Sequence, residues 1–178
     1  MIRLFVTHDL EPGARLGLDE AQSRYLMAVM RLDIGAVVEV FNGRDGAWQA
    51  EIAETGKKRC VVALTACLQP QPARSSLELV MALVKRAPLE LVIEKATELG
   101  VGAIQLVTTR RTNADHTNLA RLSAIATEAA EQCERLDVPE LKAPLKLERL
   151  LEAWPEERVL IYCDEAGDDP DALWGGTR

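Results

Sequence analysis

Hydrophobic and polar positions follow different rhythms on either side of residue 70. In the first part, short apolar runs alternate with polar turns, a pattern that predicts β-strands. A helix is predicted from Asp19, because its carboxylate can cap the first turn of DEAQSRYLMAVM at 19–30. The turn NGRDG at 42–46 predicts a hairpin, since Asn and Gly tolerate positive φ. The predicted strands are IRLFV (2–6), AVVEVF (36–41), AWQAEI (47–52) and CVVALTACL (60–68).

The segment QPQPARSS at 69–76 separates the two parts. Prolines, glutamines and serines between apolar segments are typical of a linker. We therefore expect two domains, at 1–70 and 71–178. The first, with several short strands and a single helix, is predicted to be a small β-barrel.

The second part alternates strands with helices. After the strand SLELVMALV (76–84), a helix is predicted from the spacing of Leu89, Val92, Ile93, Ala96 and Leu99, and Gly100 ends it. Short crossovers of this kind imply parallel strands, so the fold class is α/β, with ligands expected beyond the carboxyl ends of the strands. The later elements are a strand at 103–109, a helix at 118–136, a short strand at 139–143, a helix at 147–154 and a final strand RVLIYCDE at 158–165.

The glycines of Gly100-Val101-Gly102 do not form a dinucleotide fingerprint. That fingerprint needs a strand before the glycines and a helix after them, so that the helix amides meet the pyrophosphate. Here the order is helix, glycines, strand. A G-x-x-x-x-G-K-[ST] loop and a G-x-S-x-G elbow are also absent from the sequence.

The helix at 118–136 carries two rows of side chains. An apolar row is predicted to be buried, and a polar row lies beside it, because steps of three, four and seven residues return to one side of a helix. The polar row is either a solvated face with ion pairs or a holder for a planar polar ligand, and periodicity does not separate these alternatives. The buried row is Leu119, Leu122, Ala126, Ala129, Cys133 and Leu136; the polar row is Arg121, Glu128, Gln132 and Arg135.

Charged pairs follow two predicted strands at their carboxyl ends. Arg110 and Arg111 follow one strand, and the planar fork of arginine suits phosphate oxygens or a base edge. Asp164 and Glu165 end the last strand, where two acids could hold a ribose or cap a turn. A solvent-facing strand end explains either pair equally well.

Composition and charge restrict the classes of function. With 48% hydrophobic and 28% charged residues, no apolar run long enough for a membrane helix and no secretory leader, the chain is expected to be cytoplasmic. A net charge of −7 argues against a surface that binds nucleic acid everywhere, but permits one local basic face. The candidates are 57–59, Lys85-Arg86 and Arg110-Arg111.

The cysteines and histidines do not have the spacing of a metal site. The four cysteines include no C-x-x-C pair, and His8 and His116 have no ligand-like neighbours. We expect reduced, buried thiols and no metal. The cysteines are Cys60, Cys67, Cys133 and Cys163.

Three segments resemble one known family. They are LVMALVKRAPLELVIEKATELGVGAIQLVTTRRT (79–112), IATEAAEQCERLDVPEL (125–141) and YCDE (162–165). They are similar to the ribosomal RNA small subunit methyltransferase E family, within the SPOUT superfamily. The resemblance covers essentially the whole chain. It implies a PUA-like RNA-binding barrel followed by a trefoil-knot α/β methyltransferase domain.

The resemblance also implies a reaction and partners. Family members methylate N3 of one uridine in 16S rRNA with S-adenosylmethionine, and SPOUT enzymes generally act as homodimers with the site completed across the interface. The expected partner is therefore 16S rRNA or the small ribosomal subunit, and the expected activity is that of an rRNA (uracil-N3-)-methyltransferase.

Site residues are carried over by position. Lys95, Glu98 and Gly100 match the KATELG motif, and Arg31 and Gly35 match the barrel motif within YLMAVMRLDIG. The resemblance and the charge pattern together assign RNA contacts to Arg31, Lys85, Arg110 and Arg111.

The resemblance assigns catalysis to the polar helix. Glu128, Gln132 and Arg135 match the motif near the active site, with Glu128 expected near uracil N3 and Arg135 or Arg111 expected to hold phosphate or stabilise the uracil anion. Asp164 and Glu165 are the cofactor contacts expected within this chain. Glu134 stands where the family often has glycine.

The resemblance breaks off at the end of the chain. Family members continue through a GPEGG loop and an L-G-x-x-I-L-R-x-E-T-A segment, which tie the knot and form most of the cofactor pocket, whereas this chain stops at DALWGGTR. We therefore expect an incomplete, inactive methyltransferase domain. A non-catalytic RNA-binding or ribosome-assembly protein is the alternative, and an unrelated nucleotide-binding α/β enzyme is disfavoured by the misplaced glycines.

The first prediction concerns the cofactor. The 178-residue chain is expected to bind S-adenosylmethionine weakly or not at all, because most of the cofactor pocket lies in the segments that follow in the family. Isothermal titration calorimetry measures this directly. Tight binding by this chain would contradict the expectation.

Overall fold

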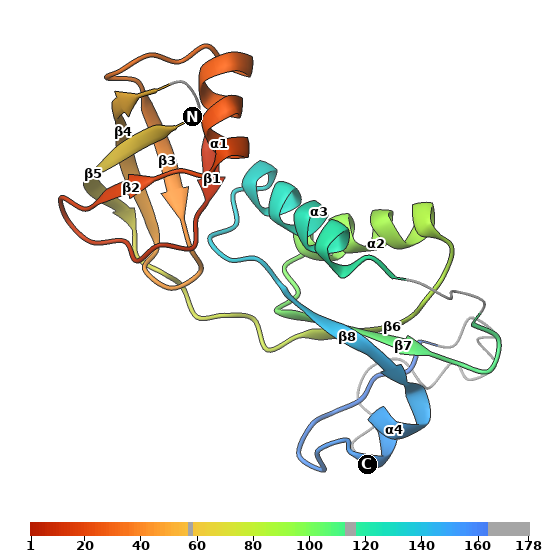
Figure 1. Cartoon of the computed structure of the whole chain (residues 1–178). Coiled ribbons are helices and arrows are strands. Elements are labelled where there is room, and N and C mark those ends of the chain that lie inside the picture. The colour runs from red at the N-terminus through yellow and green to blue at the C-terminus, as the bar shows by residue number, and fades with distance from the viewer. Residues whose placement is uncertain (57–58, 113–116, 164–178) are drawn as a thin grey trace.

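A computed structural model describes residues 1–56, 59–112 and 117–163. These residues form a five-stranded curled sheet followed by a three-stranded parallel sheet (Figure 1). Both sheets are present where the sequence pattern predicts them, so the expected α/β class with an N-terminal β-unit is confirmed.

The first sheet has the order β1-β3-β4-β5-β2. β1 runs parallel to β3, and the other neighbours are antiparallel. The sheet curls like half of a barrel, with β1 and β2 as its two edges. Alternation did not predict β2, which is only three residues long. The strands are β1 (Arg3–Phe5), β2 (Arg15–Gly17), β3 (Val37–Phe41), β4 (Ala47–Thr55) and β5 (Cys60–Gln69).

The predicted cap and hairpin are confirmed. Asp19 Oδ1 accepts a hydrogen bond of 2.7 Å from Gln22 N and starts α1 (Glu20–Arg24), which continues as a π-helix, η1 (Tyr25–Val29). Between β3 and β4, Asn42 Oδ1 accepts from the backbone N–H groups of Arg44 and Asp45, while Gly43 has a φ of 77°. The turn is therefore specified by local side-chain chemistry.

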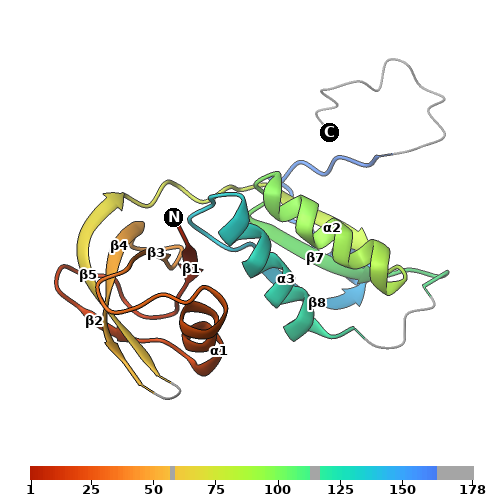
Figure 2. The ribbon, with the colours of Figure 1, turned by 90° about the horizontal axis from the view of Figure 1, so that it is seen from above.

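The second sheet has the order β6-β7-β8 with all strands parallel. Figure 2 shows α2 and α3 side by side across one face of this sheet. Their apolar sides form a core with the strands, in which Ile93, Ile104 and Ala126 are fully buried or nearly so. The elements are β6 (Glu78–Ala82), α2 (Arg86–Glu98), β7 (Ala103–Thr108), α3 (Leu119–Gln132), β8 (Glu140–Lys146) and α4 (Leu147–Glu152).

The two glycines after α2 have structural roles. Gly100, with a φ of 88°, follows the C-cap; its N–H donates to Thr97 O, and the N–H of Val101 donates to Ala96 O. This is the Schellman arrangement, which satisfies the last carbonyls of a helix. A Cβ on Gly102 would lie 1.9 Å from the carbonyl oxygen of Ser75. The close passage of the linker therefore requires glycine at 102.

α3 ends earlier than predicted. Its last residue is Gln132, and Glu134 has a φ of 64°, a left-handed conformation that breaks the helix. Arg135 therefore does not belong to the polar row of α3, because it lies in the connection to β8. Leu136 is buried as predicted, although it is not helical.

A further prediction is wrong. The segment 158–163 forms no strand, and its apolar side chains are exposed, Tyr162 to 83%. Its β-branched pattern suits a strand, but a strand also needs a neighbour to receive its hydrogen bonds, and these residues pair with neither edge of the described sheet. The helix predicted from the spacing of Leu89 to Leu99 is present as α2, with Leu99 as its exposed C-cap.

Arg3 joins the two sheets. Its guanidinium donates to the carbonyl oxygens of Ala130, Glu131 and Arg135, at the C-terminus of α3, and pairs with Glu39 at 2.7 Å. In return, Glu131 Oε1 accepts a hydrogen bond of 2.8 Å from the Phe5 N–H. A small apolar cluster covers this junction, formed by Phe41, Ala47, Ala130 and Leu136, with Phe5 and Val138 against it.

Glu134→Gly is expected to raise the free energy of unfolding by about 1 kcal/mol, because glycine adopts left-handed φ without steric cost. Chemical denaturation measures the change. Glu134→Ala is the control: it removes the same exposed charge, keeps Cβ and should give no gain. An equal gain in the alanine variant would show that charge, not backbone strain, is responsible.

Glu131→Gln is expected to change the pH dependence of stability. Burial raises the pKa of the Glu131 carboxyl above its ordinary 4.5, so the native state holds this proton more tightly than the unfolded state does. The wild-type protein therefore loses stability as pH rises above 4.5. The glutamine variant, whose side chain still accepts a hydrogen bond from the Phe5 N–H, does not. The free energy of unfolding of the variant should therefore increase relative to that of the wild type as pH rises from 4.5 through the raised pKa of the native carboxyl.

Denaturation at several pH values tests this, with Glu148→Gln on the exposed side of α4 as the matched control. Parallel pH profiles for wild type and Glu131→Gln would contradict the burial argument.

Candidate functional site

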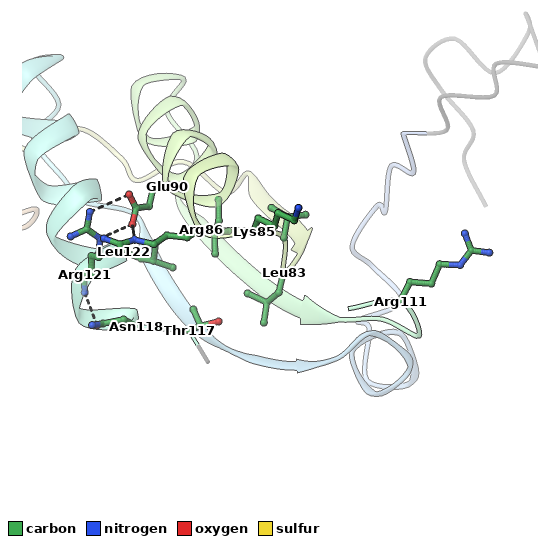
Figure 3. Close-up of a pocket in the computed structure, with 11 residues that line it drawn as sticks. Leu83, Lys85, Arg86, Glu90, Arg111, Thr117, Asn118, Arg121 and Leu122 are labelled. Atoms are coloured by element: carbon green, nitrogen blue, oxygen red, sulfur yellow. Dashed lines mark hydrogen bonds and ion pairs between the residues drawn. The ribbon is translucent and has the colours of Figure 1, made fainter. Parts of the chain in front are cut away.

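A pocket of about 780 Å³ opens at the carboxyl ends of β6 and β7, between the first turns of α2 and α3 (Figure 3). This is where the parallel sheet predicts a ligand site. We call it the strand-end pocket. Its charged lining is Lys85, Arg86, Glu90, Arg111 and Arg121; Thr117 and Asn118 add polar groups, and Leu83, Val84, Leu89 and Leu122 are apolar.

Local sequence determines how these side chains reach the pocket. β6 ends at Ala82, and Lys85 is the N-cap of α2, with Pro88 in the first turn, where its missing N–H costs nothing. On the other side, Asn118 caps α3 by accepting a 3.0 Å hydrogen bond from Arg121 N. Each helix therefore begins at the pocket rim.

Glu90 links the two helices inside the pocket. Its Oε1 accepts from Arg86 Nε at 2.7 Å and from Arg121 Nε at 2.5 Å, and its Oε2 accepts from Arg121 at 3.2 Å. Figure 3 shows both contacts. The hydrogen bonds from Arg121 and Arg86 lower the pKa of Glu90 to about 2, so this carboxylate is charged at all physiological pH values.

The pocket carries an excess of positive charge. Among the described residues, four cationic side chains and one carboxylate line the pocket, which gives these groups a local charge of +3 in a chain whose net charge is −7. Guanidinium and ammonium groups at a helix N-terminus favour anions, phosphate above all. The pocket is therefore suited to a phosphate-bearing ligand.

A second hollow, of about 620 Å³, lies between α2 and α3. We call it the helix groove. Glu128 and Gln132 line it, together with Arg121, so three members of the predicted polar row do lie on one side of α3. Glu90 and Arg121 also line the strand-end pocket, and the two hollows are therefore contiguous.

Arg135, predicted to be in this row, lies elsewhere. Its guanidinium donates to Thr97 O at 2.7 Å and to Val101 O at 3.0 Å, and it pairs with Asp137 at 3.0 Å. These partners lie at the C-terminus of α2, where a cation is favoured by the helix dipole. The predicted place of Arg135 in the polar row of α3 is thus corrected: α3 ends before Arg135, and its side chain contacts the end of α2.

Of the four predicted RNA contacts, two line the strand-end pocket and two lie elsewhere. Lys85 and Arg111 line the strand-end pocket, although Figure 3 shows Arg111 pointing away from the Glu90–Arg121 pair. Arg110 is exposed in the turn after β7 and does not line the pocket. Arg31 is exposed on the first sheet's unit, directly after η1, with a φ of 55°.

Other predicted positions fall outside the described residues: Asp164, Glu165, His116, and residues 57 and 58 of the basic segment 57–59. Of the family motif, Lys95 pairs with Glu94 and Glu98 on the exposed side of α2. These ion pairs raise the pKa of the lysine. Lys95 and Glu98 therefore act as a solvated helix face in this structure.

Sequence reasoning did not assign Glu90. The spacing of Arg86 and Glu90, four residues apart on a predicted helix, could have indicated an ion pair. Its second partner, Arg121, is 31 residues away, and only the packing of α2 on α3 brings it there.

The cysteines are only partly as expected. All four are free thiols; Cys60 is buried, but Cys67 and Cys163 are exposed. Within residues 1–56, 59–112 and 117–163, His, Cys, Asp and Glu side chains do not gather in groups of three that could hold a metal ion. None of the helices in this same part of the chain is long and apolar enough to cross a membrane.

Two family models match the chain. One, described as an RNA methyltransferase domain, matches residues 71–175, more than half of the chain. The other, described as an RNA methyltransferase PUA domain, matches residues 18–65. The first match includes all three strands of the parallel sheet, and the second includes β3, β4 and part of β5, whereas β1 and β2 lie before it.

Individual relatives agree. The chain is 29% identical to the ribosomal RNA small subunit methyltransferase E of Rickettsia conorii, over 96% of this chain and 70% of the relative. It is 34% identical to the protein of the same name from Synechocystis, over 89% of this chain and 54% of the relative.

A solved structure of a candidate methyltransferase from Legionella pneumophila, with bound S-adenosylmethionine, matches with a TM-score of 0.80 and 27% identity, over 88% of this chain and 67% of the other. The chain thus spans 54% to 70% of the length of these proteins.

Proposed function

Because the chain belongs to the ribosomal RNA small subunit methyltransferase E family, we propose that it is part of an enzyme that methylates 16S rRNA, at N3 of a uridine, and so contributes to small-subunit maturation. The observation that carries this proposal is the strand-end pocket, a site of net positive charge in an acidic protein. A chain of this charge attracts RNA only where its cations are concentrated.

The strand-end pocket is proposed to hold the RNA backbone. Lys85, Arg86 and Arg121 supply the phosphate contacts, and Arg111 at the outer rim contacts a neighbouring part of the RNA. Phosphate contacts position the RNA without reading its sequence. The apolar floor, which includes Leu89 and Leu122, provides a surface for a base or a ribose.

The proposed methyl donor is S-adenosylmethionine, with which the Legionella protein was crystallised. The strand-end pocket does not fit this molecule, because a sulfonium is itself a cation and the pocket already holds an excess of positive charge. We therefore assign the pocket to the RNA, and we derive no step through the donor from its residues.

The helix groove is proposed to supply the proton chemistry. Uracil N3 carries a proton that must leave before the nitrogen can attack a methyl group, and a carboxylate in reach can remove it. Glu128 is the proposed base, since it lies in the groove next to the pocket. Gln132, one turn further along α3, is a hydrogen-bonding group for the base edge.

The N-terminal unit and self-association complete the proposal. We assign residues 1–70 to RNA binding, with Arg31 as an exposed contact, and residues 71–178 to methyl transfer. The family resemblance further supports a homodimer. Leu91 and Leu99, large apolar side chains exposed on α2, are candidate contacts.

The proposal is tested by methyl transfer to small ribosomal subunits that lack the modification, in a protein that also carries the C-terminal segments found in the family. Glu128→Gln should lower turnover by about 10²–10⁴-fold, the usual contribution of a general base, and leave rRNA affinity unchanged. Glu148→Gln on α4, which has the same charge change and lies outside both hollows, should behave as wild type.

Wild-type turnover by Glu128→Gln across the pH range would rule out the base assignment. Binding of rRNA without any methyl transfer by the protein that carries these C-terminal segments would favour the non-catalytic RNA-binding role instead.

A further inference from the structure

We propose that Glu90 is a positioning residue, which holds Arg86 and Arg121 so that their terminal nitrogens converge on one RNA phosphate. The inference rests on the proposed RNA substrate and assigns a specific geometry to its site. Among the described residues that line the strand-end pocket, Glu90 is the one carboxylate, a group that simple attraction of RNA does not require.

The hydrogen bonds determine which edges of the arginines remain open. Glu90 takes the Nε–H of Arg86, and the Nε–H and one terminal N–H of Arg121. Within the described residues, neither guanidinium has another hydrogen-bond partner. Each guanidinium has five N–H groups, so the terminal edges stay available. Those edges can form paired hydrogen bonds to phosphate oxygens.

Without Glu90, the two arginines would have little to hold them. Their side chains are 72% and 49% exposed, whereas Glu90 is only 21% exposed. Long exposed side chains sample many rotamers, and two guanidinium groups repel each other. A shared carboxylate removes both obstacles before the RNA arrives, and preorganisation of this kind increases affinity.

The bridge also fixes the distance between two helices. Arg86 and Glu90 are one turn apart on α2, and Arg121 lies on α3. The carboxylate therefore links Arg86 on α2 to Arg121 on α3. A Glu90 that acted only as a counter-charge would instead weaken RNA binding, because it lowers the pocket's charge from +4 to +3.

The test compares three variants by their affinity for unmodified 16S rRNA at several salt concentrations. Glu90→Asp keeps the charge but shortens the reach, and Glu90→Gln removes the charge. Both should bind rRNA about tenfold more weakly, as expected when a charge-assisted contact is lost. Glu94→Gln, one turn further along α2, makes the same charge change without touching either arginine. It should bind as wild type or slightly more tightly.

A background that lacks both arginines separates positioning from a general role in the fold. In Arg86→Ala/Arg121→Ala, rRNA should bind more weakly. The slope of log affinity against log salt concentration should fall by no more than the contribution of about two phosphate contacts. Adding Glu90→Gln to this background should have no further effect on affinity. Thermal melts of every variant confirm that the chain is folded.

Several results would overturn the inference. Wild-type affinity in Glu90→Asp would do so, as would tightening in Glu90→Gln like that in Glu94→Gln. A further loss when Glu90→Gln is added to the double-alanine background would show a general structural effect. If the double-alanine variant itself binds rRNA as wild type, the RNA does not use this pocket, and the proposed site fails together with Glu90.

Discussion

Two arginines occupy the C-termini of the two helices that cover the parallel sheet. Arg135 donates to the carbonyl oxygens of Thr97 and Val101, at the end of α2, and Arg3 donates to those of Ala130 and Glu131, at the end of α3. Helix C-termini leave carbonyls without intrahelical partners, and a guanidinium satisfies several at once. These contacts hold α2, α3 and the curled sheet together. The opposite ends of the helices, which form the strand-end pocket, are thereby held in fixed positions.

The arginines with a structural role and those with a proposed RNA-binding role differ in how much of their side-chain surface is exposed. Arg3 and Arg135 have little exposed side-chain surface and all their contacts lie within the protein, so neither is open to a ligand. Arg86 and Arg121 are half or more exposed and keep free N–H groups. Motif position alone does not predict this difference for Arg135, because a motif records the residue type and not the partners of its side chain.

The sequence predicts elements that depend on local chemistry. The Asp19 cap, the NGRDG turn and the Gly100 stop each involve residues within a few positions of one another, and all three are confirmed. Predictions that depend on tertiary contacts succeed less well. The segment 158–163 pairs with neither edge of the parallel sheet, and α3 ends at Gln132, before a left-handed Glu134 that periodicity cannot detect. The Glu90 bridge spans 31 residues, so only the packed helices reveal it.

The two hollows share lining residues, which links their proposed roles. Glu90 and Arg121 belong to both the strand-end pocket, suited to phosphate, and the helix groove, which carries Glu128 and Gln132. A shift of Arg121 therefore changes both hollows at once. Placing a reacting base is demanding, because small displacements from the productive geometry are costly in rate. An RNA backbone held by a rigid arginine pair fixes where the attached nucleotide enters the groove. In the proposed reaction, binding of the RNA backbone in the strand-end pocket thus also positions the uracil in the helix groove.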